Sequence, residues 1–410
     1  MRIAVISVHG CPLLTAGARE AGGMNVYIAT LSRELGARGI GVDVFSRWHA
    51  PEVPEIENLA PNVRVIHLEA SGRQFLSKDE IYPHLAQFEA GVLAFERREG
   101  RGYDLIHSHY WLSGLVGLGL QRDWQTPHVA MFHTLGAVKN QARAGEHESD
   151  LRIQSEQQII RQADAVVVAS PQEEARLKRL YDHAQGKVRV IPCGVDTDTF
   201  RPLEMAEARR HLGLNGERIL LFVGRPDPLK GLEILIGAAS LLEHPKGVRV
   251  LVVGGEGDQS DSAYQPIHAL AQTLDIAEQV SFTGAVSQQQ LPYYYSAADV
   301  CVVPSYYESF GLVALEAMAC GTPVVASRVG GLQTTVRDGE TGFLIPWHCP
   351  EPFAERLDLL LVNETLRQSL GEAAHTAAQA YRWPAVADSV LELCEELTTI
   401  PAAPFHTYEV

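Results

Sequence analysis

The feature that most constrains the fold is a regular alternation of short apolar runs with amphipathic stretches. The runs "RIAVISV", "YDLIHSH" and "AVVVAS" are rich in Val and Ile and are bounded by Gly, Pro or polar residues, as strands are. Between two such runs, "MNVYIATLSRELGARG" has the pattern of an amphipathic helix and ends on Gly. Strands that are apolar throughout and alternate with helices form parallel sheets covered on both faces. The sequence therefore predicts an α/β protein with doubly wound parallel sheets.

The chain has 410 residues, more than one ordinary core supports, which predicts two domains. The stretch Val188–Glu204, "VRVIPCGVDTDTFRPLE", interrupts the alternation with Pro, Gly and Asp, and we interpret it as the linker. We expect a Rossmann-like first domain over residues 1–195, a second over 196–385, and a C-terminal helix over 386–410 whose packing back onto the first domain stays open. Ligands of such sheets bind beyond the carboxyl ends of the strands, so two facing domains would enclose one central cleft.

Composition narrows the class of function. Acidic residues outnumber basic ones by 50 to 34, giving a net charge of −16, which argues against nonspecific nucleic-acid binding. The longest gentle apolar run, Leu112–Leu120, is far too short for a membrane span, and the N-terminus reads as a strand rather than a signal peptide. Six scattered cysteines without a CxxC pair predict reduced thiols in a cytoplasmic protein and argue against zinc. The acidic run Asp196–Asp198 suits a turn, so no metal and no cofactor are expected.

The stretch Tyr307–Ala317, "YESFGLVALEA", carries two acids in an otherwise apolar or small run. Glu308 follows the strand "VCVVP", and Glu316 lies about a turn and a half into a helix that begins near Gly311. The first amides of such a helix can bind an anion, while carboxylates pair with vicinal hydroxyls, a combination that a sugar nucleotide offers. The alternative is a helix-dipole glutamate beside a partly exposed one. The amides concerned are those of Phe310, Gly311 and Leu312.

Two further loops follow predicted strands. In "LFVGRPDPLKG", Arg225 and Lys230 leave the same strand end and could neutralise a diphosphate without a metal, unless they are ordinary surface bases. In "AGGMNVY", Gly22 and Gly23 would allow a ligand to approach the backbone closely, unless they only form a tight turn. Neither this loop nor "VVGGEGD" is the GxGxxG dinucleotide fingerprint.

Strand ends in the first half of the chain carry histidines with basic and hydroxyl residues nearby. If these strand ends converge, they predict a phosphate pocket; the alternative is a set of structural histidines, and spacing alone does not decide between them. The residues are Lys78, His109, Tyr110, His133, Thr134, Lys139 and Arg152.

Taken together, these motifs resemble the retaining nucleotide-sugar glycosyltransferases of the GT-B fold, nearly from end to end. "GRPDPLKG" is similar to the donor-phosphate element of that family, "ESFGLVALEA" to its EX7E element, and "GVDTDTFRP" to its interdomain linker. "GGMNVY", "HSHYWLSG" and "HTLGAVKN" resemble the inositol-phosphate N-acetylglucosaminyltransferases of mycothiol synthesis. "FLSKDEIYPHL" and the "LG" of "HTLGAVK" are closer to sucrose-phosphate synthases. Gly136 departs from the first subclass, which usually has Ala there, and Asn25 from the second, which more often has Gln.

The resemblance implies roles for individual residues. Contacts with the acceptor phosphate are implied for Lys78, Tyr110, Thr134 and Arg152, and lining of the acceptor site for Asn25 and Lys139. Contacts with UDP are implied for Gly23, Arg225, Lys230 and Glu316, with Glu316 at the ribose. Contacts with the transferred sugar are implied for His133 and Glu308.

The expected reaction is transfer of a hexosyl group from a UDP-sugar to a phosphorylated acceptor with retention of the α configuration. No convincing carboxylate nucleophile is found on the acceptor side, which favours a front-face route in which the departing diphosphate helps to deprotonate the acceptor. Arg225, Lys230 and the amides after Glu308 would stabilise the charge on the leaving group. The candidate catalytic residues are therefore Arg225, Lys230, Glu308 and His133.

UDP-glucose with fructose 6-phosphate is the preferred pair, and UDP-N-acetylglucosamine with inositol 1-phosphate is second. A UDP-sugar epimerase or hydrolase, and a non-enzymatic UDP-sugar sensor, are less favoured alternatives.

Overall fold

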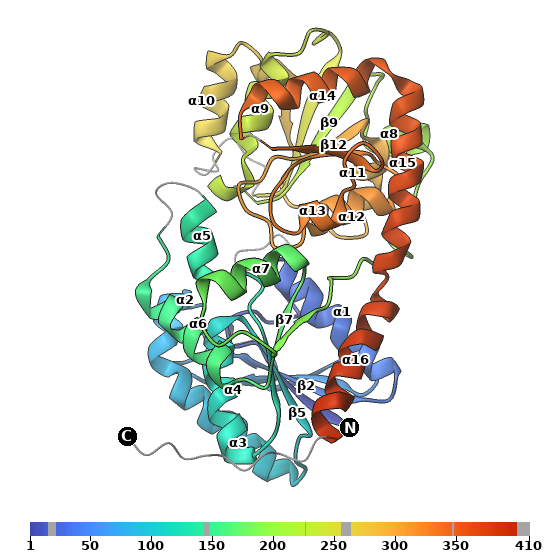
Figure 1. The fold of residues 1–410 in the computed structure, drawn as a ribbon. Helices are drawn as coiled ribbons and strands as arrows, with labels where there is room; N and C mark the ends of the chain where they lie inside the picture. Colours follow the sequence, from blue (N-terminus) through green and yellow to red (C-terminus); the bar gives the residue numbers. More distant parts are fainter. Residues whose placement is uncertain (15–21, 143–146, 226, 256–263, 347, 400–410) are drawn as a thin grey trace.

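The structure, a computed structural model, contains two α/β units that lie one above the other in Figure 1. It describes residues 1–14, 22–142, 147–225, 227–255, 264–346 and 348–399. Parts of four predicted segments lie outside the described residues: residue 21 of "AGGMNVY", residue 226 of "GRPDPLKG", residues 256–258 of "VVGGEGD" and residues 400–410 of the C-terminal segment.

The first unit is built on an eight-stranded sheet in the order β3-β4-β2-β1-β5-β6-β7-β8. Only β3 is antiparallel to its neighbour, so the carboxyl ends of the other seven strands lie at one edge of the sheet. The strands are β1 (Arg2–Ile6), β2 (Gly41–Arg47), β3 (Ile56–Ala60), β4 (Val63–Leu68), β5 (Leu105–His109), β6 (His128–Met131), β7 (Ala165–Val168) and β8 (Val188–Val190).

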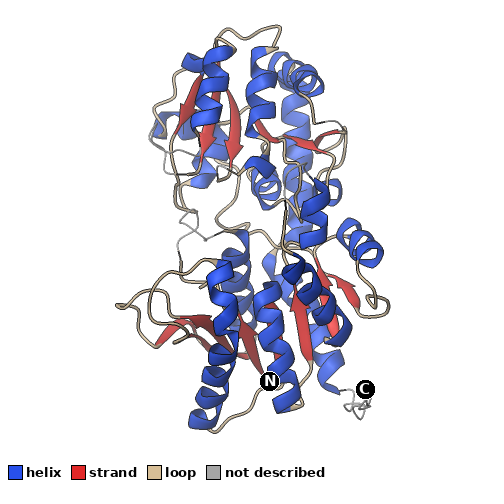
Figure 2. Cartoon of the chain, turned by 90° about the vertical axis from the view of Figure 1, so that its left-hand side faces the viewer, coloured by secondary structure: helices blue, strands red, loops and turns tan. Residues whose placement is uncertain are grey.

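The second unit has a six-stranded sheet, all parallel, in the order β11-β10-β9-β12-β13-β14. Its strands are β9 (Arg218–Val223), β10 (Val248–Val253), β11 (Val280–Phe282), β12 (Val300–Val303), β13 (Val324–Ser327) and β14 (Gly342–Ile345). In both units the side chains of the central strands are mostly buried, because helices cover the two faces of the sheet (Figure 2), whereas the edge strands β3, β8 and β11 are more exposed. The two sheets, parallel except for the edge strand β3, confirm the predicted α/β, doubly wound class.

Sixteen α-helices are found in the described part of the chain, and most connect successive parallel strands. In the first unit they are α1 (Gly23–Ala37), α2 (Lys78–Ile81), α3 (Leu85–Glu99), α4 (Tyr110–Trp124), α5 (Gly136–Ala142), α6 (Asp150–Gln162) and α7 (Pro171–Leu180). In the second they are α8 (Met205–His211), α9 (Leu232–Ser240), α10 (Gln265–Thr273), α11 (Leu291–Ala297), α12 (Leu312–Ala319), α13 (Leu332–Thr335), α14 (Pro350–Val362) and α15 (Glu364–Ala378). The last helix is α16 (Trp383–Thr399).

Helix α16 leaves the second unit and lies against α1 of the first (Figure 1). The ring of Trp383 packs on Tyr27 of α1 with centroids 5.4 Å apart. Farther along the helix, a carboxylate oxygen of Asp388 lies 2.8 Å from the Arg38 guanidinium. These contacts tie the end of the chain to its beginning and so help to fix one unit relative to the other.

Two strands differ from the sequence expectation. The predicted linker begins with a strand, because Val188–Val190 forms β8 and pairs with β7. The strand β3 was not predicted, because "IENLA" lies on an exposed edge and so lacks the continuous apolar run of a central strand. Both strands lie at the two ends of the first sheet, where one side of the backbone meets no neighbour.

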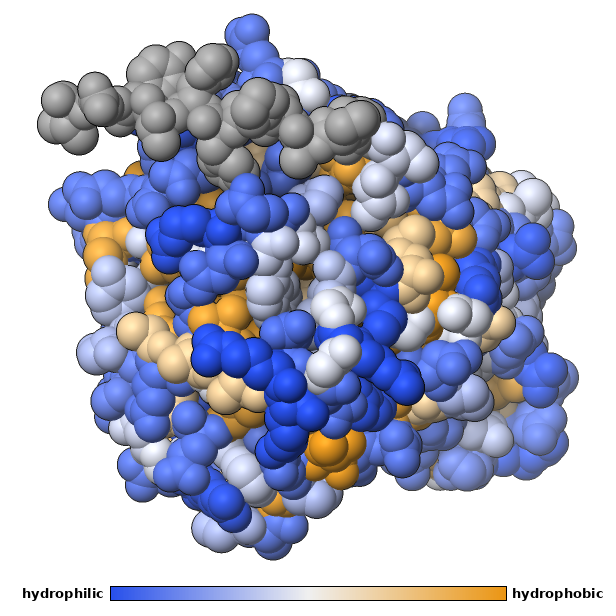
Figure 3. Space-filling view, turned by 90° about the horizontal axis from the view of Figure 1, so that it is seen from below, coloured by the Kyte–Doolittle hydropathy of each residue, from blue (hydrophilic) through white to orange (hydrophobic). Residues whose placement is uncertain are grey.

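None of the described helices is both long and apolar enough to cross a membrane. The surface of the first unit that points away from the second is mostly hydrophilic, with apolar side chains in small separate patches (Figure 3).

Candidate active site

A hollow of about 580 Å³ lies between the two units, at the carboxyl ends of both sheets. It brings together the strand ends that the sequence singled out in the two halves of the chain. From the first unit the predicted residues on its wall are Gly22, Gly23, Asn25, Lys78, Tyr110, His133, Thr134, Lys139 and Arg152. From the second they are Arg225, Lys230, Glu308, Phe310, Gly311 and Leu312.

Two helix N-termini from different units meet in this hollow. Helix α1 begins at Gly23 and α12 begins at Leu312, directly after Gly311. A side chain on Gly23 would bring its Cβ to 3.0 Å from Leu312 Cδ1, so the two helix ends approach closely. Gly311 has a φ of 94°, which a residue with a side chain rarely adopts. The amides at both helix N-termini favour an anion between them.

Lys230 and Glu308 form an ion pair on the wall of the second unit. The Lys230 Nζ donates to Glu308 Oε2 over 2.7 Å. Lys230 ends a short 3-10 turn (Pro228–Lys230) between β9 and α9, and Glu308 follows the neighbouring strand β12. Arg225, by contrast, is exposed at the rim of the hollow. An anion that enters here would meet the exposed guanidinium of Arg225 and the ammonium group of Lys230, which could exchange its carboxylate partner for the anion.

The loop that carries Glu308 rests on two glycines. The Gly331 amide donates to the Glu308 carbonyl over 3.0 Å. Gly330 has a φ of 44°, and a Cβ at this position would lie 1.8 Å from the same carbonyl oxygen. The position of Glu308 therefore depends on a close backbone contact that only glycine allows.

Glu316 is not among the described residues that line the hollow; it sits one turn into α12, half-buried behind the wall. Burial raises the pKa of its carboxyl to about 7, while a hydrogen bond from Tyr295 opposes the rise. The Tyr295 hydroxyl donates to Glu316 Oε2 over 2.7 Å from the neighbouring helix α11. Tyr295 was missed by the sequence analysis, because nothing in "LPYYYSAAD" indicates which tyrosine faces α12.

His133 lies at the end of β6 with a φ of 61°. Its Nε2 shares a hydrogen bond of 2.9 Å with His109 Nδ1, and burial lowers the pKa of His133 to about 3, so the ring is neutral near pH 7. The Ser309 hydroxyl donates to the His133 carbonyl and thereby joins the two units across the hollow. Ser309 in turn shares a hydrogen bond of 3.0 Å with the Tyr307 hydroxyl. The sequence analysis missed Ser309 and Tyr307 as binding-wall residues.

The predicted cationic pocket forms around the ring of Tyr110. The Arg152 guanidinium carbon lies 4.8 Å and the Lys78 ammonium 5.5 Å from the centre of this ring. Arg152 Nη2 donates to both the carbonyl (2.7 Å) and the hydroxyl (3.0 Å) of Thr134. Four residues from α2, α4, α6 and the loop after β6 thus converge, as the phosphate-pocket prediction requires.

Two acids that the sequence analysis missed partly neutralise this pocket. Arg152 pairs with Glu148 and with Glu156, each at 2.8 Å, and Lys139 also pairs with Glu148. Although burial opposes ionisation, Arg152 and Lys139 hold the pKa of Glu148 below its usual range. The four-residue spacing of Glu148, Arg152 and Glu156 was the signal that could have revealed them, although Glu148 lies two residues before α6 begins. The cations of Lys78, Lys139 and Arg152 thus face Glu148 and Glu156, and Asp79 also lines the hollow, so the formal charges of this wall cancel.

Asn25 lines the hollow, but its amide is occupied by the loop around it. Its Nδ2 donates to the Cys11 carbonyl over 2.7 Å, and its Oδ1 accepts from the Gly22 amide over 3.3 Å. Another missed residue, His9, also lines the hollow and lies 4.5 Å from the Tyr110 ring.

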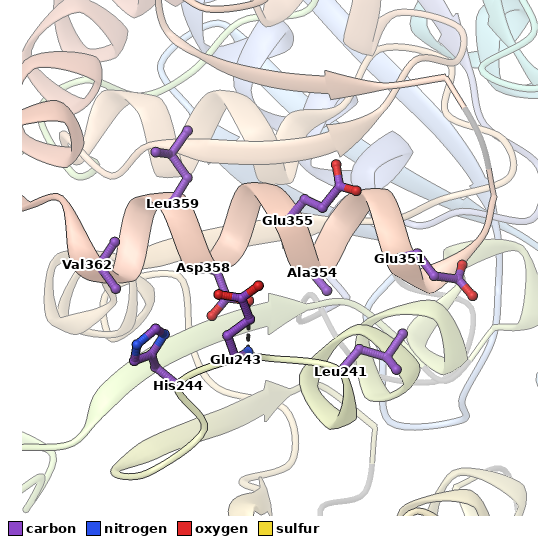
Figure 4. A pocket seen from close by; sticks show the side chains of 9 residues that line it. All are labelled: Leu241, Glu243, His244, Glu351, Ala354, Glu355, Asp358, Leu359 and Val362. Carbon is purple, nitrogen blue, oxygen red and sulfur yellow. Dashed lines mark hydrogen bonds between the residues drawn. The ribbon is translucent and has the colours of Figure 1, made fainter.

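A second hollow, of about 550 Å³, opens between the end of α9 and helix α14 (Figure 4). Four acids surround it, and the Glu243 amide donates to Asp358 Oδ2 over 3.0 Å. Its described lining holds none of the residues predicted for donor or acceptor, so it plays no part in the site described above.

Both halves of the chain resemble known proteins. Residues 21–199 match the model of Glycosyltransferase Family 4, and residues 204–377 match that of Glycosyl transferases group 1. A D-inositol 3-phosphate glycosyltransferase from Corynebacterium jeikeium is 43% identical and covers 97% of both chains; one from Catenulispora acidiphila is 43% identical over 96% of this chain and 94% of its own. The solved structure of a sucrose-phosphate synthase from Thermosynechococcus elongatus matches with a TM-score of 0.90 and 39% identity, over 97% of this chain and 98% of the other.

Proposed function

We propose a function for a chain that belongs to the family 4 and group 1 glycosyltransferases and has their GT-B fold, as the sequence resemblance predicted. It is a glycosyltransferase. Our proposal is that it moves a hexosyl group from a UDP-sugar to a phosphorylated sugar or polyol and retains the α configuration. UDP-glucose and fructose 6-phosphate, which give sucrose 6-phosphate and UDP, are the preferred pair.

The observation that carries the proposal is the placement of two cationic groups on opposite walls of one hollow. Lys78 and Arg152 lie beside Tyr110 in the first unit, and Arg225 and Lys230 lie at the helix α12 end of the second. One phosphate-binding group would suffice for a hydrolase or a sensor of UDP-sugars. A second group, on the facing unit, suits a transferase whose acceptor carries its own phosphate.

In the proposed donor complex the diphosphate lies between the N-termini of α1 and α12. Lys230 then turns from Glu308 to the diphosphate, and Arg225 closes in from the rim, so both stabilise the charge that grows on the leaving group. Glu308, once released, accepts hydrogen bonds from hydroxyls of the transferred sugar, and Glu316 does the same for the ribose.

The transfer step breaks the bond between the anomeric carbon and the diphosphate oxygen and forms the bond to the acceptor oxygen on the same face. The acceptor hydroxyl gives its proton to the departing diphosphate, which leaves as UDP. His133 is neutral near pH 7 and offers a polar group and a carbonyl near the transferred sugar, not a charge. Closure of the two units around the bound substrates would exclude water, which would otherwise compete as acceptor.

A second acceptor is favoured by a specific observation. The relatives that are 43% identical over nearly the whole chain are named as D-inositol 3-phosphate glycosyltransferases. We therefore keep UDP-N-acetylglucosamine with an inositol phosphate as the second candidate. Both acceptors present a phosphate and a ring of hydroxyls, and the same Lys78 and Arg152 pocket would hold either. We also place the reaction in the cytoplasm, which the six free cysteine thiols favour.

The test is UDP release with the full-length chain, with each of the two UDP-sugars offered with fructose 6-phosphate, inositol 1-phosphate, inositol 3-phosphate, or no acceptor. Release only with UDP-glucose and fructose 6-phosphate supports the preferred pair. Release only with UDP-N-acetylglucosamine and an inositol phosphate transfers the assignment to the second candidate. Equal release without an acceptor refutes a transferase with a phosphorylated acceptor.

A further inference from the structure

A cysteine and two histidines meet at the edge of the first sheet, outside the walls of the hollow. Cys11 lies in the loop after β1, His49 follows β2, and His67 is the next-to-last residue of β4. These three strands are neighbours in the order β4-β2-β1 and run parallel, so their carboxyl ends lie side by side. Cys11 and His67 are buried and His49 is half-buried. The three residues are 38 and 18 positions apart in sequence, which hides them from a search for metal-binding spacing.

The distances among the three side chains suit a tetrahedral metal ion. One ligand atom of each residue lies within 4.8 Å of the other two, and Cys11 Sγ is 3.3 Å from His67 Nε2. Zinc bonds of about 2.3 Å to sulfur and 2.0 to 2.1 Å to nitrogen at tetrahedral angles place ligand atoms about 3.4 to 3.6 Å apart. The pair Cys11 and His67 already has this spacing, and a movement of about 1 Å by the half-buried His49 would complete it.

The hydrogen bonding of His67 prepares its Nε2 to act as a ligand. Its Nδ1 lies 2.8 Å from the carbonyl oxygen of Pro54, which can only accept, so Nδ1 carries the ring hydrogen. Nε2 is then left with a free lone pair that faces the Cys11 sulfur. A histidine fixed in this way by a backbone carbonyl is the usual arrangement behind a metal-bound imidazole.

His49 supplies an observation that is independent of that pair. Its Nδ1 is buried yet has no hydrogen-bond partner among the residues that the structure describes. A buried polar atom without a partner is unusual, and an absent ion is one of the ordinary explanations. A simple S–H···N hydrogen bond would account for Cys11 and His67 but would leave the buried Nδ1 of His49 without a partner.

We propose that Cys11, His49 and His67 form a binding site for a zinc ion, with a water as the fourth ligand. One thiolate and two imidazoles are a ligand set that suits Zn²⁺ and excludes Mg²⁺ and Ca²⁺, which prefer oxygen. The thiol of Cys11 releases its proton to the solvent when the metal binds. This site does not depend on the proposed donor or acceptor.

The site would fasten the loop after β1 to the ends of β2 and β4. The Cys11 carbonyl accepts from Asn25 Nδ2 over 2.7 Å, so the same loop supports the start of α1 at the wall of the hollow. The metal is thus a structural clamp outside the active site, and it takes no part in group transfer.

The test is titration of the metal-free, full-length protein with Co²⁺, followed by competition with Zn²⁺. Cobalt bound by a thiolate gives an intense sulfur-to-metal charge-transfer absorption, which reports on Cys11 without any measurement of activity. We expect saturation at one equivalent. Cys11→Ser should abolish the absorption and weaken zinc binding by at least about 100-fold. His49→Gln, which changes a half-buried side chain and should leave the fold intact, should weaken it by at least about 10-fold.

Cys349→Ser is the matched control, because Cys349 is a partly exposed thiol of the second unit and should leave spectrum and affinity unchanged. Three results would overturn the proposal: no saturation at one equivalent, a charge-transfer absorption that survives Cys11→Ser, or zinc affinity that His49→Gln does not alter. Far-ultraviolet circular dichroism of each variant shows that a lost absorption does not result from unfolding.

Discussion

The hydrogen bond between Tyr295 and Glu316 should set the pH range in which the donor binds. Burial raises the pKa of Glu316 to about 7, and the Tyr295 hydroxyl, 2.7 Å away, stabilises the ionised form. A hydrogen bond to a charged group contributes about 1.5 to 3 kcal/mol. One pKa unit corresponds to 1.36 kcal/mol, so Tyr295→Phe should raise the pKa of Glu316 by about 1 to 2 units.

The consequence at neutral pH follows directly. With a pKa of about 7, about half of the Glu316 carboxyls are ionised at pH 7. After the substitution the ionised fraction falls to between about a tenth and about a hundredth. If the ionised carboxylate holds the ribose, the KM for UDP-glucose should rise by about 5-fold to 50-fold at pH 7 and return toward the wild-type value near pH 9.

The assay is UDP release at saturating acceptor, with the donor varied at several pH values from 6 to 9. Tyr293→Phe is the matched control, since Tyr293 lies on the same helix and its ring stacks on His211 with centroids 4.0 Å apart, away from Glu316. A Tyr295→Phe enzyme whose donor KM follows the wild-type pH profile would refute the reasoning. So would a Tyr293→Phe enzyme with the same shift.

Three further substitutions test other walls of the hollow. Lys230→Ala removes the cation that we propose faces the leaving group, so it should lower kcat by roughly 100-fold in the UDP-release assay. Near-normal turnover would reject this role. Lys78→Ala should raise the KM for the phosphorylated acceptor by at least about 10-fold and leave the affinity for UDP, measured by calorimetry, unchanged. An equal loss of affinity for UDP would show that Lys78 does not belong to the acceptor subsite. Gly330→Ala puts a Cβ 1.8 Å from the Glu308 carbonyl oxygen, so it should displace Glu308 and lower kcat by at least about 10-fold. Gly339→Ala is the control, because no atom lies within 4 Å of the new Cβ. It should leave kcat unchanged and cause only a small loss of stability.

Lys78 is a sharper probe of the acceptor pocket than Arg152, for a reason that only the structure provides. Arg152 is 2% exposed and pairs with two carboxylates, those of Glu148 and Glu156. Its removal would leave these acids without their partner and would destabilise the fold as well as the pocket. A loss of activity in Arg152→Ala therefore carries little information about phosphate binding unless the melting temperature is measured beside it.

Much of the fold could be predicted from the sequence because strand and helix patterns are local. The apolar runs that became β1, β5 and β7 were visible in the residues themselves. Strand β3 was not, because an edge strand with polar side chains lacks the pattern of a buried one. Strand β8 was hidden in the linker, since three residues beside Pro and Gly are too few to show a period.

In the candidate site, too, some residues could be predicted from the sequence and others could not. Position after a strand singled out Glu308, Lys230 and Tyr110, because parallel strands gather their carboxyl ends at one edge. The partners of these residues come from other parts of the chain. Tyr295 meets Glu316, and Ser309 meets the carbonyl of His133, only after helices and units have packed.

The sequence by itself determined the α/β class, the family and the groups that can bind phosphates and hydroxyls, because these depend on residue type and local order. Only the tertiary structure decided how those groups are paired and charged. It made Lys230 the partner of Glu308, set carboxylates against Lys139 and Arg152, and raised the pKa of Glu316 through burial. It also brought Cys11 together with two distant histidines. Distance and burial govern electrostatic energies, and neither is a property of sequence order.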